Sequence, residues 1–358
     1  MAIGKHDAKV LAEDANIDKK KKRRRPIWIG ICSGVTVLIL GLVGIFLYYF
    51  GGLRTSELNP DDLGIDSGYH DAIDENITNI ALFGIDSRAG GDSDVGLSDA
   101  IMILSINHNT NKVKLISIMR DSYVQINGRG DKLTHAYGYG GAALAVKTLN
   151  QNFNLDITEY VTVNFDQLAK VVDAVGGITL DITESERTYI NAYMTDLNWT
   201  IDSYLQESGP NTHLNGQQAV GYARIRAIGN DQARTGRQRK VLQAVFEKVS
   251  TMSALKYPSL AKTIIPMVTT SFSYSDVLDF LPVLTSGQIV IDEAMIPGDY
   301  DDAKSATING IYYMQYDLEK ATDHIHKFIY EDIHPNTEPE TSTDSSTESS
   351  SQNSSSKS

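Results

Sequence analysis

The chain has 358 residues, a length that allows one large domain or two small ones with a sizeable hydrophobic core. Its formal net charge of −13 argues against a nucleic-acid-binding protein, because phosphate backbones select for basic surfaces. The one cysteine, Cys32, excludes a disulfide framework within the chain.

A basic run followed by an apolar stretch predicts a membrane anchor near the N-terminus. Residues 19–25 are all Lys or Arg, and residues 27–50 carry no charged side chain. About 24 apolar residues are enough for a helix to cross a hydrocarbon core roughly 30 Å thick. Because positive charge stays inside, we expect residues 1–26 in the cytoplasm and the rest of the chain outside. A cleaved signal peptide is the alternative, but such peptides have a shorter apolar core.

Composition divides the part of the chain beyond the anchor. Residues 51–76 are polar and rich in Gly, Asp and Asn, which predicts a linker. Residues 335–358 are mostly Ser and Thr, so they cannot bury enough surface to offset their conformational entropy, and we expect a disordered tail. Between them we expect a main domain at residues 77–254 and a C-terminal extension, residues 255–334, packed on it or following it.

Strand-like and helix-like patterns alternate within the main domain. Asp166 and Asn215 are expected N-caps, and Gly176 with Gly177 is expected to end the first capped helix. We predict an α/β fold in which helices flank a mixed central sheet, in α-β-α layers, preceded by the one transmembrane helix. The expected strands are residues 78–85, 100–106, 112–119, 160–165 and 178–182, and the expected helices are 142–153, 166–175, 215–222 and 235–250.

Charged residues follow the ends of the first strands. If residues 108–111 form a hairpin loop, Asp99 lies opposite Met119 or Arg120. Asp86 and Arg88 follow the preceding strand, and Asp121 follows Arg120. Converging carboxylates can hold Mg²⁺, and arginines beside them bind phosphate through two oxygens at once. The alternative is a set of ordinary salt bridges at loop ends.

A second group of polar residues lies downstream, at Arg224, Arg226, Arg234 and Gln238. Arg234 and Gln238 are four residues apart, so they share a helical face with the apolar Val241, Val245 and Val249. This pattern predicts a pocket mouth. Cations at a helix N-terminus oppose the helix dipole unless an anion binds there, so the pattern fits a phosphate site as well as a solvated basic helix start.

Other chemistry finds no support in the sequence. His108, His135 and His213 do not have a metal-ligand spacing, and we assign them no catalytic role. No nucleophile-elbow, P-loop or zinc-binding pattern occurs.

Seven segments between residue 79 and about residue 250 form an ordered series. The segments are NIALFGIDSR (79–88), LSDAIMILSI (97–106), ISIMRDSYVQI (116–126), KLTHAYGYGG (132–141), VDAVGGITLDI (172–182), LNGQQAVGYARIR (214–226) and RTGRQRKVL (234–242). In this order and spacing they resemble the LytR-CpsA-Psr family of bacterial phosphotransferases.

The resemblance implies an enzyme at the outer face of the bacterial cytoplasmic membrane. It would move an anionic glycan, of the teichoic acid or capsular polysaccharide type, from an undecaprenyl-pyrophosphate carrier to peptidoglycan, using Mg²⁺. It also implies a long apolar pocket for the polyprenyl tail. By motif, Asp86 and Asp99 resemble the Mg²⁺-associated carboxylates, and the residues resembling the pyrophosphate-binding set are Arg88, Arg120, Arg224, Arg226, Arg234 and Gln238.

Two positions depart from the family pattern. Leu97 stands where the family usually has an arginine, and Met119 stands where it usually has a proline. The first departure removes one expected phosphate contact.

The resemblance favours phosphoryl transfer assisted by Arg120. An arginine is a poor base because its pKa stays above about 12, so Asp99 or Asp121 is the expected protein base if one takes part. Two rival functions are a membrane-anchored transcription attenuator and a non-catalytic receptor for lipid-linked glycans. The first is opposed by a cytoplasmic segment of only about 25 residues without a helix-turn-helix pattern.

Overall fold

The computed structural model describes residues 54–55, 58–66, 76–86, 96–200, 203–272, 283 and 291–335. The predicted anchor at residues 27–50, most of the predicted tail, and Arg88 lie outside these residues. Within the described ranges, no helix is both long and apolar enough to cross a membrane.

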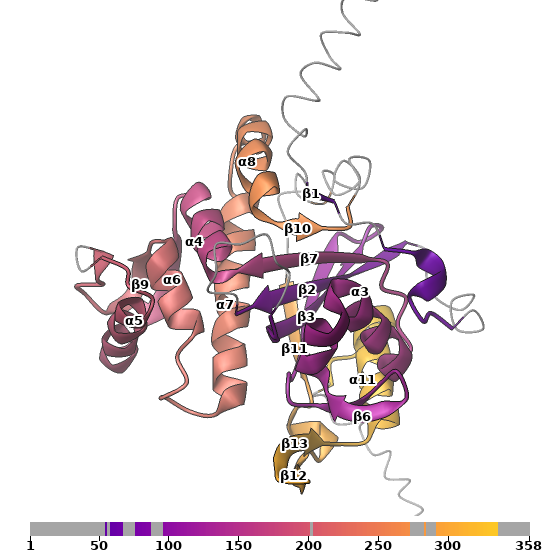
Figure 1. Cartoon of the computed structure of the whole chain (residues 1–358). Helices are drawn as coiled ribbons and strands as arrows, with labels where there is room; N and C mark the ends of the chain where they lie inside the picture. Colours follow the sequence, from indigo (N-terminus) through magenta and orange to yellow (C-terminus); the bar gives the residue numbers. More distant parts are fainter. Residues whose placement is uncertain are drawn as a thin grey trace, which may run out of the picture.

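A mixed sheet lies at the centre of the molecule (Figure 1). Counting only described residues, it has seven strands in the order β1-β10-β7-β2-β3-β4-β11. β2, β3 and β4 are antiparallel neighbours, whereas β7 runs parallel to β2 and β11 runs parallel to β4. The strands are β1 (Arg54–Thr55), β2 (Ile77–Ile85), β3 (Ser98–Asn107), β4 (Lys112–Ile118), β7 (Glu159–Asn164), β10 (Thr269–Thr270) and β11 (Ile291–Ile296).

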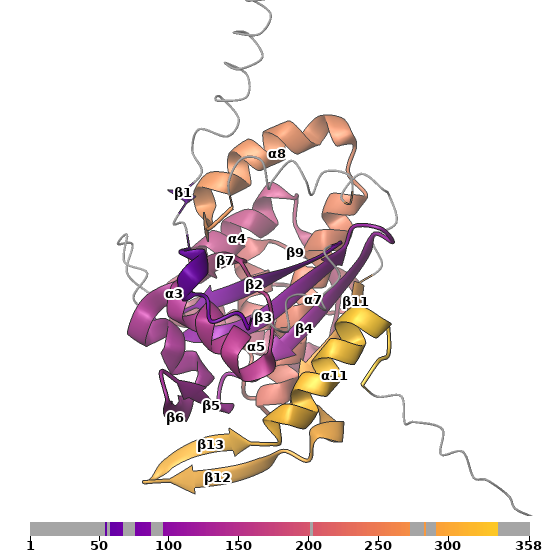
Figure 2. The same ribbon diagram turned by 90° about the vertical axis from the view of Figure 1, so that its right-hand side faces the viewer.

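Helices cover both faces of this sheet, as Figures 1 and 2 show, which confirms the predicted mixed α/β architecture. One face carries α3 (Leu133–Phe153) and α11 (Leu318–Glu331), and the other carries α4 (Phe165–Ala174), α7 (Asp231–Ser250) and α8 (Tyr257–Ile264).

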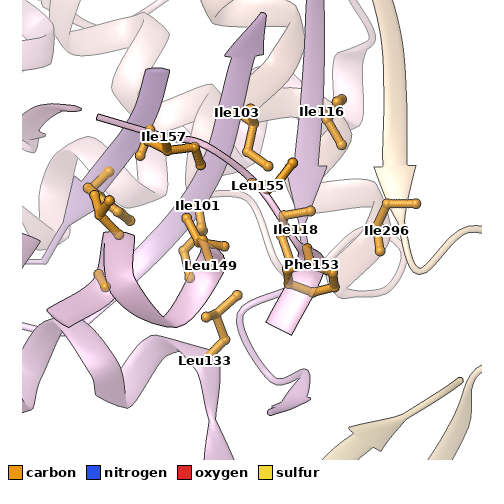
Figure 3. Close-up of a cluster of buried hydrophobic side chains, with 14 of the residues drawn as sticks. Ile101, Ile103, Ile116, Ile118, Leu133, Leu149, Phe153, Leu155, Ile157 and Ile296 are labelled. Atoms are coloured by element: carbon orange, nitrogen blue, oxygen red, sulfur yellow. The ribbon is translucent and has the colours of Figure 1, made fainter. Parts of the chain in front are cut away.

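Successive side chains along each strand point to opposite faces of the sheet. Ile101 and Ile103 of β3 pack with Leu149 of α3 in the cluster drawn in Figure 3. Met102 and Leu104 point to the opposite face. The sheet is therefore apolar on both sides, which explains why its strands are continuous apolar runs in the sequence.

A smaller lobe lies beside the sheet on the α7 side. It contains α5 (Glu184–Asp196), α6 (Gly216–Ala223) and a separate two-stranded sheet of β8 (Ile178–Ile182) and β9 (Gly209–Leu214). Its own core includes Ile190, Leu214 and Ile225, and α7 contributes Val245 to that core. α7 is therefore buried from two sides.

Three element boundaries differ from the predictions. Asp166 is not the N-cap of α4, because Asn164 caps this helix in a capping box with Gln167. α3 begins at Leu133 rather than at 142, with a kink at Gly140 and Gly141, where Gly141 has φ of 62°. α7 begins at Asp231 rather than Thr235, because Asn230 accepts the cap hydrogen bond from the backbone N–H of Ala233.

Segments on either side of the predicted main domain pack against it. Part of the predicted linker packs on the domain: Leu63 is buried, and its carbonyl accepts a hydrogen bond from Asn150. The predicted extension, residues 255–334, supplies β11 to the central sheet. The remaining elements are β5 (Tyr123–Ile126), β6 (Arg129–Lys132), β12 (Lys304–Ile308), β13 (Ile311–Gln315) and the short helices η1 (Pro60–Asp62), η3 (Ala254–Lys256), η4 (Ile265–Met267) and η5 (Asp299–Asp301).

Candidate active site

Charged side chains meet where β2 and β4 end and β3 begins. Asp86 directly follows β2, Asp99 is the second residue of β3, and Arg120 comes two residues after β4. Nη1 of Arg120 donates to Oδ1 of Asp99 at 2.5 Å. The predicted neighbourhood of Asp99 and Arg120 is therefore confirmed, and it follows from the antiparallel register that aligns Met102 with Ser117.

Asp99 connects the sheet to the loop after α6. Its second oxygen, Oδ2, accepts a hydrogen bond from Nη2 of Arg226 at 3.1 Å. Both carboxylate oxygens of Asp99 are thus engaged by arginines that come from distant parts of the sequence. This brings together the two groups of residues that the sequence presented separately.

Arg120 lies among several carboxylates. Its Nε is 3.4 Å from Oδ2 of Asp121 and 3.7 Å from Oδ2 of Asp231. Burial opposes the charge of Arg120, but Asp99, Asp231 and Asp121 outweigh it and raise the pKa of the guanidinium. Arg120 therefore stays protonated and cannot act as a base.

Arg234 is a buried cation with little compensating charge. It is 2% exposed, and its nearest carboxylate is Asp231, whose Oδ1 lies 2.7 Å from Nη2. Its Nε has no hydrogen-bond partner among the described atoms. Burial lowers the pKa of Arg234 despite Asp231, and the positive charges of Arg120 and Arg226 lower it further. A bound anion would relieve this excess of positive charge.

Gln238 lies one turn along α7 from Arg234, and its buried Oε1 also has no hydrogen-bond partner among the described atoms. The apolar stripe that continues from these two residues differs in part from the prediction. Val241 faces the cavity as expected, but Val245 packs in the lobe instead. Because α7 is buried on two sides, Leu242 and Phe246 replace the predicted Val245 and Val249 in the cavity wall.

Aromatic side chains position the arginines of the loop after α6. The guanidinium carbon of Arg224 lies 4.6 Å from the ring centroid of Phe165 and 5.5 Å from that of Tyr193. Oη of Tyr193 accepts a hydrogen bond from the backbone N–H of Arg226 at 3.2 Å. Such stacking favours a planar guanidinium in a fixed orientation.

These residues form the polar end of a cavity of about 590 Å³. The rest of its wall is mostly apolar, and most of it comes from β2, β3, β7, α4 and α7. The wall extends along β3 from Asp99 to Ile106, a length of about 23 Å at roughly 3.3 Å per strand residue. The polar side chains at its mouth are Asp86, Asp99, Arg224, Arg226, Arg234 and Gln238.

Asp121 lies outside the cavity wall. Its Oδ1 accepts a hydrogen bond from Nζ of Lys132 at 2.7 Å, so it bridges Arg120 and Lys132. Of the predicted catalytic residues, Asp99 lines the cavity, while Arg120 and Asp121 adjoin its mouth through their contacts.

The donor set at the mouth fits a magnesium ion. The described residues contain no group of three or more His, Cys, Asp or Glu side chains that could hold a metal alone. Asp86 and Asp99 supply two carboxylates, and Mg²⁺ commonly takes one or two carboxylates and completes its shell with water and phosphate oxygens. Both oxygens of Asp99 are engaged by arginines, so a metal ion would share this carboxylate with Arg120 and Arg226.

Sequence reasoning missed several residues that organise the site. The first is Asp231, the partner of both Arg120 and Arg234, which an N-cap at Asn230 would have placed in the first turn of α7. Tyr193 gave no signal, because its role depends on how the lobe packs against α7.

Comparisons with known proteins agree with this arrangement. The model of the LytR-CpsA-Psr family matches residues 58–328. A polyisoprenyl-teichoic acid–peptidoglycan teichoic acid transferase, TagU of Oceanobacillus iheyensis, is 35% identical over 254 residues, which cover 66% of this chain and 73% of that protein.

Solved structures share the fold. The crystal structure of Bacillus subtilis TagV has a TM-score of 0.58 and is 27% identical, and the match covers 72% of this chain and 98% of TagV. A structure of the family protein YwtF (TagT) with bound octaprenyl pyrophosphate has a TM-score of 0.53 and is 23% identical, with 77% of this chain and 94% of the other covered. On the match over residues 58–328 and the 35% identity to TagU, this chain belongs to the LytR-CpsA-Psr family.

Proposed function

We propose that the chain is a phosphotransferase that moves an anionic glycopolymer, of the teichoic acid or capsular polysaccharide type, from an undecaprenyl-pyrophosphate carrier to peptidoglycan. The observation that carries this proposal is the cavity, which joins an arginine-rich mouth to a long apolar interior. A pyrophosphate suits the mouth and a polyprenyl chain suits the interior. Membership of a family that includes teichoic acid transferases supports the same reaction.

The transfer step forms one bond and breaks one. A hydroxyl oxygen of peptidoglycan forms a bond to the phosphorus that carries the glycopolymer. The bond from that phosphorus to the bridging oxygen of the pyrophosphate breaks, and polyprenyl monophosphate leaves. Arg224, Arg226 and Arg234 would bind the phosphate oxygens, and Arg120 would stabilise the charge that develops on them.

The proton of the attacking hydroxyl goes to a carboxylate or to water. Asp99 and Asp121 are the two candidates, because both contact Arg120. Asp121 also accepts a hydrogen bond from Lys132, so a positive charge would remain beside the carboxyl group once it had taken the proton.

Magnesium is part of the proposal. A magnesium ion held by Asp86, Asp99 and the pyrophosphate would supply positive charge to the leaving group. The proposal also includes the single membrane anchor at residues 27–50, with the N-terminus inside and the domain outside the cytoplasmic membrane, where lipid-linked substrates are found.

The test is release of polyprenyl phosphate from a short-chain pyrophosphate-linked glycan by the purified chain. We expect Arg120→Ala to lower the rate by about 100-fold or more, as removal of one transition-state donor does in other enzymes. Arg129→Ala, at an exposed arginine of β6, is the matched control and should keep wild-type turnover.

Two results would contradict the proposal. Wild-type turnover by a folded Arg120→Ala variant would remove Arg120 from the mechanism. Tight binding of the lipid-linked glycan without release, at every magnesium concentration, would instead favour a receptor.

A further inference from the structure

Aromatic side chains gather around Lys132, which binds Asp121, on the side of the sheet that carries α3. They come from the first turns of α3 and from β13, and Figure 2 shows the ribbon of β13 near that of β6. We call this group the aromatic platform, and define it as His135, Tyr139, Tyr312 and Tyr313 around Asp131 and Lys132.

Tyr139 is the most exposed member of the platform. Its residue is 66% exposed, yet its hydroxyl donates to Oδ2 of Asp131 at 2.7 Å. Its ring centroid lies 5.8 Å from that of His135, which in turn contacts Oδ1 of Asp131 at 2.9 Å. The ring of Tyr139 is therefore held in one orientation while much of its surface is open, which lowers the entropy lost on binding a ligand.

The second part of the platform is the hairpin of β12 and β13. Nζ of Lys132 lies 5.6 Å from the ring centroid of Tyr312 and 5.8 Å from that of Tyr313. Tyr313 also meets Tyr123 edge to face, at 5.1 Å between centroids. Tyr312 remains 43% exposed. Lys132 thus holds the rings of Tyr312 and Tyr313 by cation–π contacts, and the ring of Tyr312 stays accessible to a ligand.

Hydrogen bonds attach the platform directly to the residues of the proposed reaction centre. The backbone N–H of Thr134 donates to the carbonyl of Arg120 at 3.0 Å, and Oγ1 of Thr134 donates to the carbonyl of Ser98 at 2.9 Å. The backbone N–H of Met314, in β13, donates to the carbonyl of Asp121 at 2.9 Å. The platform is therefore continuous with Arg120 and Asp121 through both α3 and β13.

The geometry of phosphoryl transfer indicates which substrate the platform could bind. In phosphoryl transfer, the attacking and leaving oxygens lie roughly in line on opposite sides of the phosphorus. The proposed leaving group, polyprenyl phosphate, belongs to the cavity on the face of Met102 and Leu104. The platform lies on the other face, with Leu133 and Tyr137, so an acceptor held there would approach from the side away from the leaving group.

We infer that the aromatic platform is the binding subsite for the sugar rings of the acceptor glycan. Tyrosine rings stack on the apolar faces of sugars, and the nearby Asp131, Lys132 and His135 can bind hydroxyl and acetamido groups. The inference rests on the proposed function for the identity of the acceptor, but binding of sugars by the platform does not require turnover.

The first experiment measures binding without any donor. A soluble, uncross-linked peptidoglycan oligosaccharide is titrated into the full chain in detergent, and the dissociation constant is measured by calorimetry. We expect Tyr139→Ala and Tyr312→Ala each to weaken binding by about tenfold, the loss typical of one aromatic contact. Tyr139→Phe keeps the ring and should bind within about twofold of wild type.

Leu255→Ala is the control for loss of an exposed apolar side chain, because Leu255 is 91% exposed in η3, away from the platform. We expect it to bind the oligosaccharide as wild type does. Unchanged binding by both Tyr139→Ala and Tyr312→Ala would overturn the inference.

The second experiment separates acceptor from donor. With a lipid-linked donor, Tyr139→Ala should raise KM for the acceptor about tenfold and leave KM for the donor unchanged. A rise in donor KM alone would overturn the inference, because the platform would then hold donor sugars. If wild type shows no turnover at all, the proposed function fails, while the binding titration still decides on the platform.

Discussion

Glu186 and Arg237 form an ion pair between α5 and α7, with Oε1 3.3 Å from Nε and both side chains largely buried. Arg237 also donates to the carbonyls of Ile225 and Ile228, at 3.3 and 3.0 Å. These carbonyls belong to the loop that presents Arg224 and Arg226 to the cavity. Arg237 therefore acts as a positioning residue rather than a ligand of the substrate.

Replacing Arg237 tests this positioning role. Arg237→Gln should lower the free energy of unfolding by about 2 kcal/mol, between the values for exposed and buried ion pairs. It should also lower kcat/KM for the donor by about tenfold, because the loop arginines lose their fixed geometry. Urea unfolding and steady-state kinetics measure the two effects. Lys240→Gln, at an exposed cation of the same helix, should change neither. A loss of stability with normal donor kinetics would limit Arg237 to a structural role.

The same ion pair makes the free energy of unfolding depend on pH. Burial opposes the charge of Glu186, but hydrogen bonds from Thr183 and from Arg237 outweigh it and lower the pKa of the carboxyl below its ordinary 4.5. The unfolded chain then binds more protons than the folded one, so this contribution to stability is complete above about pH 4.5 and is lost as the pH falls. Glu186→Gln should flatten that part of the curve of unfolding free energy against pH. Equal slopes for both proteins below pH 4.5 would contradict the assignment.

The proposed magnesium site can be tested at Asp86. A chelator should abolish transfer by the wild type, and added Mg²⁺ should restore it. Asp86→Asn removes one charged ligand at nearly constant side-chain volume. It should raise the Mg²⁺ concentration needed for half-maximal rate by at least ~10-fold, because loss of an outer-shell partner already has an effect of that size. Asp323→Asn, at an exposed carboxylate of α11, is the control. Activity that survives chelation would exclude this metal site from the reaction.

The length of the cavity predicts selectivity for the lipid chain. Val113 lines the end of the cavity that lies opposite the arginines, at the start of β4. Val113→Phe should shorten the cavity and lower the affinity for an octaprenyl donor about tenfold or more relative to a farnesyl donor, since each buried methylene contributes ~0.8 kcal/mol. Competition binding with the two donors measures the ratio. Val113→Ala does not shorten the cavity and should leave the ratio of the two donor affinities near the wild-type value. An unchanged ratio in Val113→Phe would show that the polyprenyl chain binds outside this cavity.

Much of the central sheet was predictable because its signals are local. The apolar runs of β2, β3 and β4 and the intervening hairpin fix a register, and that register alone places Asp99 beside Arg120. The cap of α6 at Asn215 was also correct, since its capping box is readable in the sequence.

The rest depends on contacts between distant segments. Nothing local shows that Arg226 reaches Asp99, or that Asp231 serves both Arg120 and Arg234. The error at Asp166 arose because two neighbouring residues can both cap a helix, and only the geometry of Asn164 and Gln167 chooses between them. The aromatic platform could not be predicted from the sequence either, because β13 and α3 come together only in the folded chain.

The edge strand β11 has a consequence for how the chain reaches its folded state. Ile291 pairs with Val113, which precedes it by 178 positions, so β4 has no neighbour on one side until almost the whole domain has been synthesised. Contacts of such long range form slowly, and an unpaired apolar strand invites association with other chains. The growing polypeptide therefore needs protection until residues 291–296 are available for pairing. Products truncated before that strand should aggregate through β4 rather than accumulate as smaller enzymes.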